Sequence, residues 1–281
     1  MRTLLIILSG IFTALAGWLW YHHANEVRES ITYFPADPDS RFLEAKTGID
    51  FGGEKNGTYE MTVKSSSILD RSVYLRQDIT LVFFNGVLIG KTGVWKGDVS
   101  RLDQQKIIRL NQGGLLQAIS FHHGEIHRQD GSITGIQTVT GDSVFFGNGS
   151  PHLYFFRNPE TAAEQKYAET LTEKIRTVLE EDLGRAASAF GIDRSLYRFI
   201  PLTEINRLKD LFPQEMAERI FGRLVEGLYK NYFLGIRKED EKMESPIGSH
   251  LPVIWISKNK DHLLVTFVGA DGKPHLLKQQ L

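Results

Sequence analysis

The residues from Thr3 to Tyr21, TLLIILSGIFTALAGWLWY, form a run that contains no charged side chain. As a helix rising 1.5 Å per residue, this run would span about 28 Å, close to the thickness of a bilayer's hydrocarbon core. Two tryptophans and a tyrosine gather at its end, where aromatic rings prefer the headgroup region. The sequence therefore predicts a transmembrane anchor over residues 1–21 that contacts the membrane through residues 3–21.

The charges around this run predict its orientation. Arg2 and the terminal amine precede it, whereas the first cation after it is Arg28, which lies between two glutamates. The positive-inside rule places the N-terminus in the cytoplasm, so we expect a single-pass protein in the cell membrane whose bulk is extracytoplasmic. The alternative is a signal peptide cleaved near Ala16, within an Ala-x-Ala motif, which would release a secreted protein.

The composition of the whole chain is that of a folded protein, with 41% hydrophobic and 24% charged residues. Lys and Arg number 33 against 34 for Asp and Glu, so no basic field favours binding to nucleic acid. The chain has no cysteine. Disulfides, thiolate metal sites and cysteine nucleophiles are therefore excluded.

Residues 22–50 combine mixed charges with the turn-forming segment Pro35-Ala36-Asp37-Pro38-Asp39-Ser40, and we interpret them as a stalk. Residues 51–157 change to short apolar or alternating runs separated by Gly and Asn, a pattern typical of antiparallel strands. The expected strands are 58–64, 73–84, 87–95, 105–110, 115–127, 132–139 and 143–156, with turns at Gly113-Gly114, Asp130-Gly131 and Gly141-Asp142. The clearest signal is Asn85-Gly86, which predicts a two-residue hairpin turn between apolar arms.

A helical period begins near Asn158, which is followed by Pro159 and suits the N-cap position. The apolar stripe of this predicted helix comprises Ala163, Tyr167, Leu171, Ile175, Val178, Leu179 and Leu183, while the acidic run Glu180-Glu181-Asp182 is expected to be solvated. A short helix from Thr203 to Leu211 and a longer one from Pro213 to Leu234 follow.

Two further apolar runs, Val253–Ser257 and His262–Val268, predict a C-terminal hairpin that could join the first sheet. The predicted fold is α+β: an N-terminal transmembrane helix, then a mainly antiparallel β region, then two to three helices and this hairpin. Residues 158–281 would form an α/β region that either stands alone or shares one domain with residues 51–157.

Two short motifs resemble catalytic or nucleotide-binding signatures without completing them. Gly86–Thr92 ends in Gly-Lys-Thr but has one residue too few between its glycines for a phosphate-binding loop. Gly141-Asp142-Ser143 matches three residues of the nucleophile block of Gly-Asp-Ser-Leu esterases, yet a strand pattern follows it and no Asp-x-x-His supplies a base. We interpret the first as a hairpin arm and the second as a turn.

One histidine cluster, Phe121-His122-His123-Gly124-Glu125-Ile126-His127, has the residue types of a metal site. Alternate residues of a strand share a face, so His123, Glu125 and His127 would point the same way and could bind zinc or another divalent ion. His122 would lie on the opposite face. The alternative interpretation is a solvated strand face without a metal.

No nucleophile and base, and no acid and base pair, can be placed together from the sequence, and no catalytic residue or cofactor-binding motif is predicted. We therefore expect a membrane-tethered extracytoplasmic binding or accessory module for a protein or envelope partner. The alternative is a metal-assisted hydrolase that uses His123, Glu125 and His127.

Overall fold

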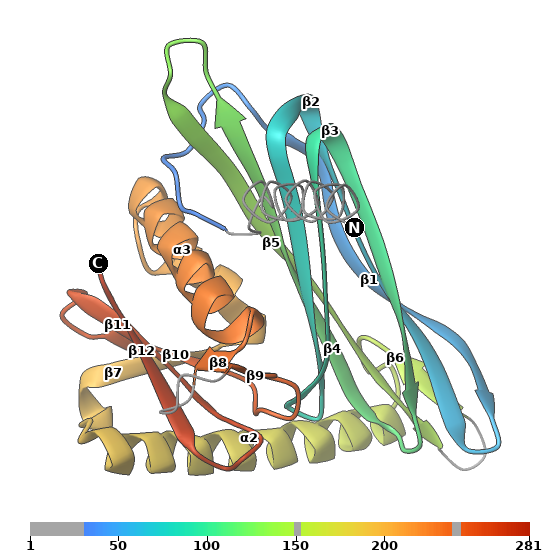
Figure 1. Ribbon diagram of the computed structural model, residues 1–281. Coiled ribbons are helices and arrows are strands. Elements are labelled where there is room, and N and C mark those ends of the chain that lie inside the picture. Colours follow the sequence, from blue (N-terminus) through green and yellow to red (C-terminus); the bar gives the residue numbers. More distant parts are fainter. Residues whose placement is uncertain (1–30, 149–152, 238–242) are drawn as a thin grey trace, which may run out of the picture. The chain divides into compact units, whose positions relative to one another are not determined.

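The computed structural model describes residues 31–148, 153–237 and 243–281 (Figure 1). The predicted anchor, its cleavage site and the first part of the stalk lie outside these residues. None of the helices within the described ranges is long and apolar enough to cross a membrane. Residues 31–281 form one compact unit.

The first and larger sheet is entirely antiparallel. Its central strand, β2, pairs with β1 along its first half and with β4 along its second half, while β3 follows the other edge of β2. Beyond β4 the order continues to β5 and β6. The strands are β1 (Phe42–Lys55), β2 (Thr58–Phe84), β3 (Val87–Leu110), β4 (Gly114–His127), β5 (Ile133–Asn148) and β6 (Leu153–Phe156).

A bulge divides β2 into its two halves. Ile68 pairs with Arg101 and Val73 with Val99, so the four residues Leu69–Ser72 face a single residue of β3. Bulges of this kind bend a strand and increase its twist. Beyond the bend β1 approaches β5, where the Thr47 hydroxyl lies 2.6 Å from that of Thr140. The curled sheet thereby encloses an apolar cluster of its own, which includes Ile49, Met61, Val82, Leu116, Val144 and Phe146.

The second sheet has the antiparallel order β12-β11-β10-β7. These strands are β7 (Tyr197–Pro201), β10 (Val253–Ser257), β11 (His262–Val268) and β12 (Pro274–Gln280), and a two-stranded ribbon joins β8 (Ile236–Arg237) to β9 (Met243–Glu244). The predicted C-terminal hairpin is therefore present as β10 and β11. It does not join the first sheet, because β7 and β12 occupy its two edges.

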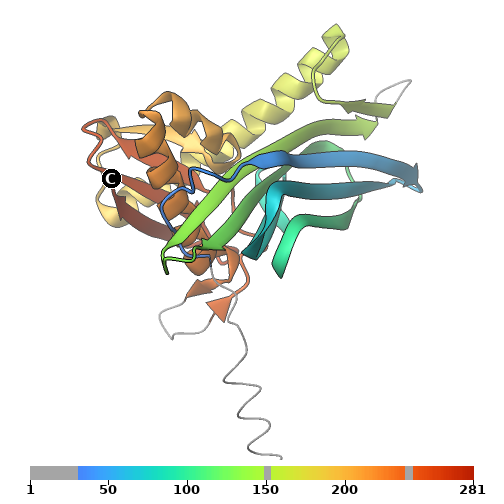
Figure 2. The ribbon, with the colours of Figure 1, turned by 90° about the horizontal axis from the view of Figure 1, so that it is seen from above.

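The helices lie on both faces of the second sheet (Figures 1 and 2). They are α2 (Ala162–Phe190), α3 (Gln214–Leu228), the 3₁₀ helices η1 (Arg194–Leu196) and η2 (Leu202–Asp210), and a π-helical turn, η3 (Tyr229–Phe233). α3 lies between the two sheets, since one core cluster joins Phe121 of β4, Leu224 of α3 and Val265 of β11. On the other face of the second sheet, Leu183 of α2 packs in a cluster with Trp255.

The predicted α+β class, the mainly antiparallel strands and the three predicted helical segments are confirmed. Asn85 and Gly86 form the predicted turn, with φ of 49° and 80°. The late helix is shorter than predicted, because α3 ends at Leu228 and a π-helical turn replaces its last residues.

Several predicted boundaries are wrong. The turn expected at Gly141-Asp142 lies inside β5. The strands predicted at 58–64 and 73–84 are one strand, β2, which bends at its bulge. The first long helix starts at Ala162, because Thr161 rather than Asn158 is its N-cap. In the segment interpreted as a stalk, β1 begins at Phe42, and its inward side chains Thr47 and Ile49 are buried.

Candidate functional site

Three segments meet at one end of the first sheet. They are the leading segment Tyr33–Arg41, the β2 bulge Leu69–Ser72 and the β4–β5 turn Arg128–Ser132. Between them lies a cleft of about 680 Å³, which we name the polar cleft; its lining residues are Asp37, Asp39, Arg71, Ser72, Val73, Tyr74, Asp98, Ile126, His127, Arg128, Gln129 and Asp130. A volume of this size suits a small molecule or a short peptide segment.

The leading segment is held on β5 by main-chain bonds. The Asp37 amide donates to the Gly135 carbonyl at 2.8 Å, and the Gly135 amide donates to the Pro35 carbonyl at 2.8 Å. Pro35 and Pro38 lack an N–H donor and so limit this pairing to a short stretch. The Asp37 carboxylate accepts from the Asp39 amide at 2.9 Å, which closes a tight turn and brings both aspartates to the cleft.

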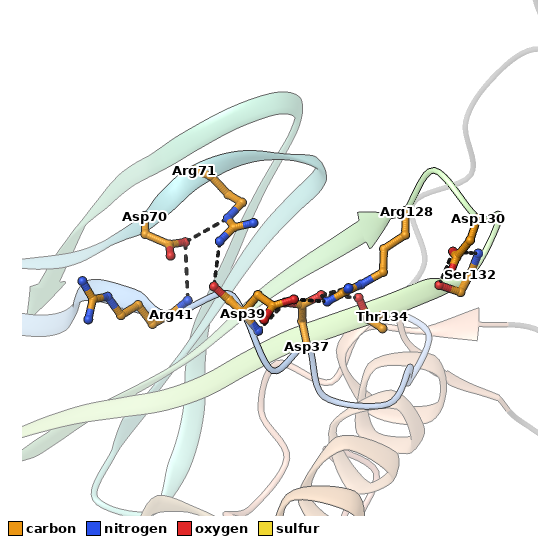
Figure 3. Close-up of polar contacts among 9 residues, drawn as sticks. All are labelled: Asp37, Asp39, Arg41, Asp70, Arg71, Arg128, Asp130, Ser132 and Thr134. Carbon is orange, nitrogen blue, oxygen red and sulfur yellow. Dashed lines mark hydrogen bonds and ion pairs between the residues drawn. The ribbon is translucent and has the colours of Figure 1, made fainter.

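Asp37 is the centre of the polar contacts in Figure 3. Its carboxylate accepts from Arg128 at 2.7 Å and from the Thr134 hydroxyl at 2.6 Å. Burial alone would raise the pKa of Asp37, but the bonds from Thr134, Arg128 and the Asp39 amide outweigh burial and hold this pKa well below its usual range. Arg128 also donates to Asp39 at 2.8 Å, so one guanidinium joins two carboxylates.

The bulge supplies the opposite wall of the cleft. Arg71 donates to the Asp39 carbonyl at 2.7 Å and lies 3.5 Å from Asp70, whose amide donates to the Arg41 carbonyl at 3.1 Å. These bonds fix the bulge to the leading segment (Figure 3). The positions of Arg71 and Arg128 are therefore set before any ligand arrives, which lowers the entropic cost of binding.

An aromatic pair lies beside these charges. The ring of Tyr74 stacks on that of His127, with centroids 3.7 Å apart and planes inclined by 14°. His127 also bonds to Glu125 at 2.5 Å. Tyr74 is 53% exposed, so the stack presents an aromatic surface to a ligand. Stacking on this surface and hydrogen bonding to the fixed polar walls are the interactions that the cleft offers.

The residues predicted to bind a metal do not form one cluster. Glu125 and His127 pair with each other, whereas His123 is buried and both of its ring nitrogens lack a hydrogen-bond partner in the described part of the chain. Burial, and then the charge of Arg76, lower the pKa of His123 to about 4. Within the described ranges, no three His, Asp or Glu side chains are arranged to hold a metal ion. The zinc site stays a prediction.

The alternative interpretation, a solvated strand face that carries His123, Glu125 and His127, is wrong for His123. His122 and His123 are 1% and 3% exposed and lie on opposite faces of β4. Phe42 of β1 lies against His122, with ring centroids 6.3 Å apart, whereas Phe121, on the same face as His123, packs in the core cluster that includes α3. The turn predicted at Asp130-Gly131 suggested an exposed strand end, but tertiary packing covers both faces of β4 at these two histidines.

His122 belongs to a buried polar network that the sequence analysis missed. It bonds to Asp78 at 2.7 Å and to Thr140 at 2.8 Å, and Arg76 lies 3.7 Å from Asp78. Arg76 and Asp78 are fully buried. The available signal was the polar alternation Arg76, Asp78, Thr80 within the predicted strand 73–84, which marks one face as polar without showing what covers it.

The solvent exposure predicted for Asp182 is also wrong. The acidic run of the first long helix was expected to be solvated, yet Asp182 is 6% exposed and bonds to His250 at 2.6 Å. His250 comes from the loop before β10, and its approach could not be inferred from the helical period of α2.

Comparisons with protein-family models, with curated proteins and with solved structures find no match for the chain.

Proposed function

We propose that this protein is a membrane-tethered extracytoplasmic module that binds a protein or envelope partner in the polar cleft. The observation that carries the proposal is the exposed Tyr74–His127 stack on walls fixed by the ion pairs of Asp37, Asp39 and Arg128. Tyrosine and arginine are the residue types enriched where binding energy concentrates in protein interfaces. The tether rests on the uncharged run Thr3–Tyr21.

The arrangement of charges favours binding over catalysis. Arg71 and Arg128 are engaged with neighbouring oxygens, and Asp37 is held in its charged form by its hydrogen bonds. A catalytic acid or base near neutral pH needs a pKa close to the working pH, and the lowered pKa of Asp37 moves this carboxyl away from that range. A preformed hydrogen-bonding wall is the simplest role for these groups.

A photo-crosslinking amino acid at Tyr74 of the full-length protein, expressed in cells, tests the proposal. The control places the same amino acid at Phe190, a 39% exposed aromatic residue at the end of α2. We expect a discrete adduct from position 74 that position 190 does not give. Failure to form an adduct at position 74, or the same adducts from both positions, would contradict partner binding in the polar cleft.

A further inference from the structure

A second pocket lies on the other side of the leading segment. It has a volume of about 360 Å³ and is bounded by the leading segment, by β5 and by the region where η2 is followed by α3. We name it the flanking pocket; the residues used below are Tyr33, Arg41, Phe42, Lys209, Glu218 and Phe221. Its size is that of a small-molecule site.

The cations of this pocket differ from those of the polar cleft. Arg71 and Arg128 of the cleft are paired with aspartates. The side chains of Arg41 and Lys209 form neither an ion pair nor a hydrogen bond with any described residue. Figure 3 shows the guanidinium of Arg41 pointing away from the ion pairs around Asp39. Two unneutralised cations at one cavity raise the local concentration of anions.

The carboxylates that line the pocket do not cancel this charge. Asp37 is neutralised by Arg128 at 2.7 Å. Glu218 is exposed and accepts a hydrogen bond from Gln214 at 3.1 Å, without a cation partner in the part of the chain that the structure describes. If the Asp37–Arg128 pair is counted as neutral, two cations, Arg41 and Lys209, and one carboxylate, Glu218, remain. The net charge at the pocket is then +1.

The remaining lining is partly apolar. Tyr33, Phe42 and Phe221 contribute rings from three elements of the structure, and Phe221 is 7% exposed. A free inorganic ion would leave these surfaces uncovered. An anion that carries an apolar group would use both the cations and the rings.

We propose that the flanking pocket binds a small organic anion whose phosphate or carboxylate contacts Arg41 and Lys209 while its apolar part lies against Tyr33, Phe42 and Phe221. The guanidinium of Arg41 provides a planar fork for two anion oxygens, and Lys209 adds a point charge. Glu218 opposes the anion and limits its affinity. This ligand is separate from the partner proposed for the polar cleft.

Isothermal titration of the purified full-length protein in a neutral detergent tests this inference, with phenyl phosphate as the probe. We expect saturable binding that weakens by about tenfold in Arg41→Gln and in Lys209→Gln and tightens by about two- to threefold in Glu218→Gln. Lys174→Gln, which removes one cation from the exposed face of α2, is the matched control and should bind as the parent does.

Three further arms make the test selective. Phenol, which lacks the anion, should bind much more weakly, and inorganic phosphate, which lacks the ring, should bind more weakly than phenyl phosphate. Glycerol phosphate binding tighter than phenyl phosphate would assign the site to the headgroup of an anionic lipid. The inference is overturned if phenyl phosphate does not bind, or if phenol or inorganic phosphate binds equally well. Arg71 lines the polar cleft and Arg41 the flanking pocket, so loss of binding in Arg71→Gln but not in Arg41→Gln would also overturn it.

Discussion

Gly86 combines two demands that only glycine meets. Its φ is 80°, and a Cβ built at this position would lie 3.3 Å from Cγ2 of Ile175 on α2. In Gly86→Val the β-branched side chain would resist the positive φ and press on the helix. We expect the free energy of unfolding to fall by about 1–3 kcal/mol, measured by urea denaturation.

Gly184 is the matched control for this change. It lies inside α2, outside the positive-φ region, and a Cβ there meets no atom within 4 Å. Gly184→Ala should therefore stabilise the protein by about 0.4–1 kcal/mol. Equal effects of the two substitutions would show that neither the turn nor the contact with Ile175 restrains residue 86.

The burial of His123 predicts a pH dependence of stability. Its pKa is lowered to about 4 in the folded protein, so below its ordinary value of 6.5 the unfolded chain takes up a proton that the folded protein does not. The stability that this difference supports is present above pH 6.5 and is lost as the pH falls toward 4. Between pH 7.5 and pH 4.5 the parent should lose on the order of 2–3 kcal/mol more than His123→Gln.

Urea denaturation of both proteins at the two pH values measures this difference. Because only the change with pH is compared, any loss of packing in the variant cancels. If parent and variant lose the same stability between pH 7.5 and pH 4.5, His123 is not held neutral in the folded protein.

Among the elements, α2 has a different N-cap from the one predicted: Thr161 caps the helix, whereas the sequence pattern favoured Asn158. The Thr161 hydroxyl accepts from the Glu164 amide at 3.2 Å, and the Glu164 carboxylate accepts from the Thr161 amide at 2.9 Å, which is a capping box. Thr161→Ala should cost about 1 kcal/mol, whereas Asn158→Ala should cost nothing measurable. Denaturation midpoints of the two variants decide this, and the reverse order would place the helix start at Asn158.

The hairpins and helices were largely predictable because their signals are local. Asn85-Gly86 requires positive φ whatever surrounds it, and the stripe that includes Ile175 and Leu183 repeats at the helical period. The start of α2 was missed because Asn158-Pro159 and Thr161 with Glu164 both match the sequence pattern of a helix N-terminus. The two hydrogen bonds between Thr161 and Glu164 place the start at Ala162.

The polar cleft was mostly hidden from the sequence. His127 was singled out, but for a metal that would also need His123. Asp37 and Arg128 are 91 residues apart, and the contact depends on the pairing of the leading segment with β5. In the sequence, a segment that combines proline and aspartate resembles a solvated loop. Only the fold brings the Arg128 guanidinium to these aspartates.

At the scale of the whole molecule, the tether is the part of the proposal that rests on sequence alone. A reporter active only outside the cytoplasm, fused after Leu281, should be active, and the mature protein in the membrane fraction should retain residues 1–21. An inactive reporter would refute the orientation. A soluble product that starts near Gly17 would refute the anchor.

If a partner occupies the polar cleft, a bulky side chain that fills the cleft should block its binding. Ser72 is exposed on the bulge and lines the cleft, so Ser72→Trp should obstruct it without removing an ion pair. Ser188→Trp, on the exposed part of α2, is the matched control. The measurement is the yield of the crosslinked adduct from position 74 in each background. We expect about a tenfold loss with Ser72→Trp and no loss with Ser188→Trp, and an unchanged yield with Ser72→Trp would show that no partner occupies the cleft.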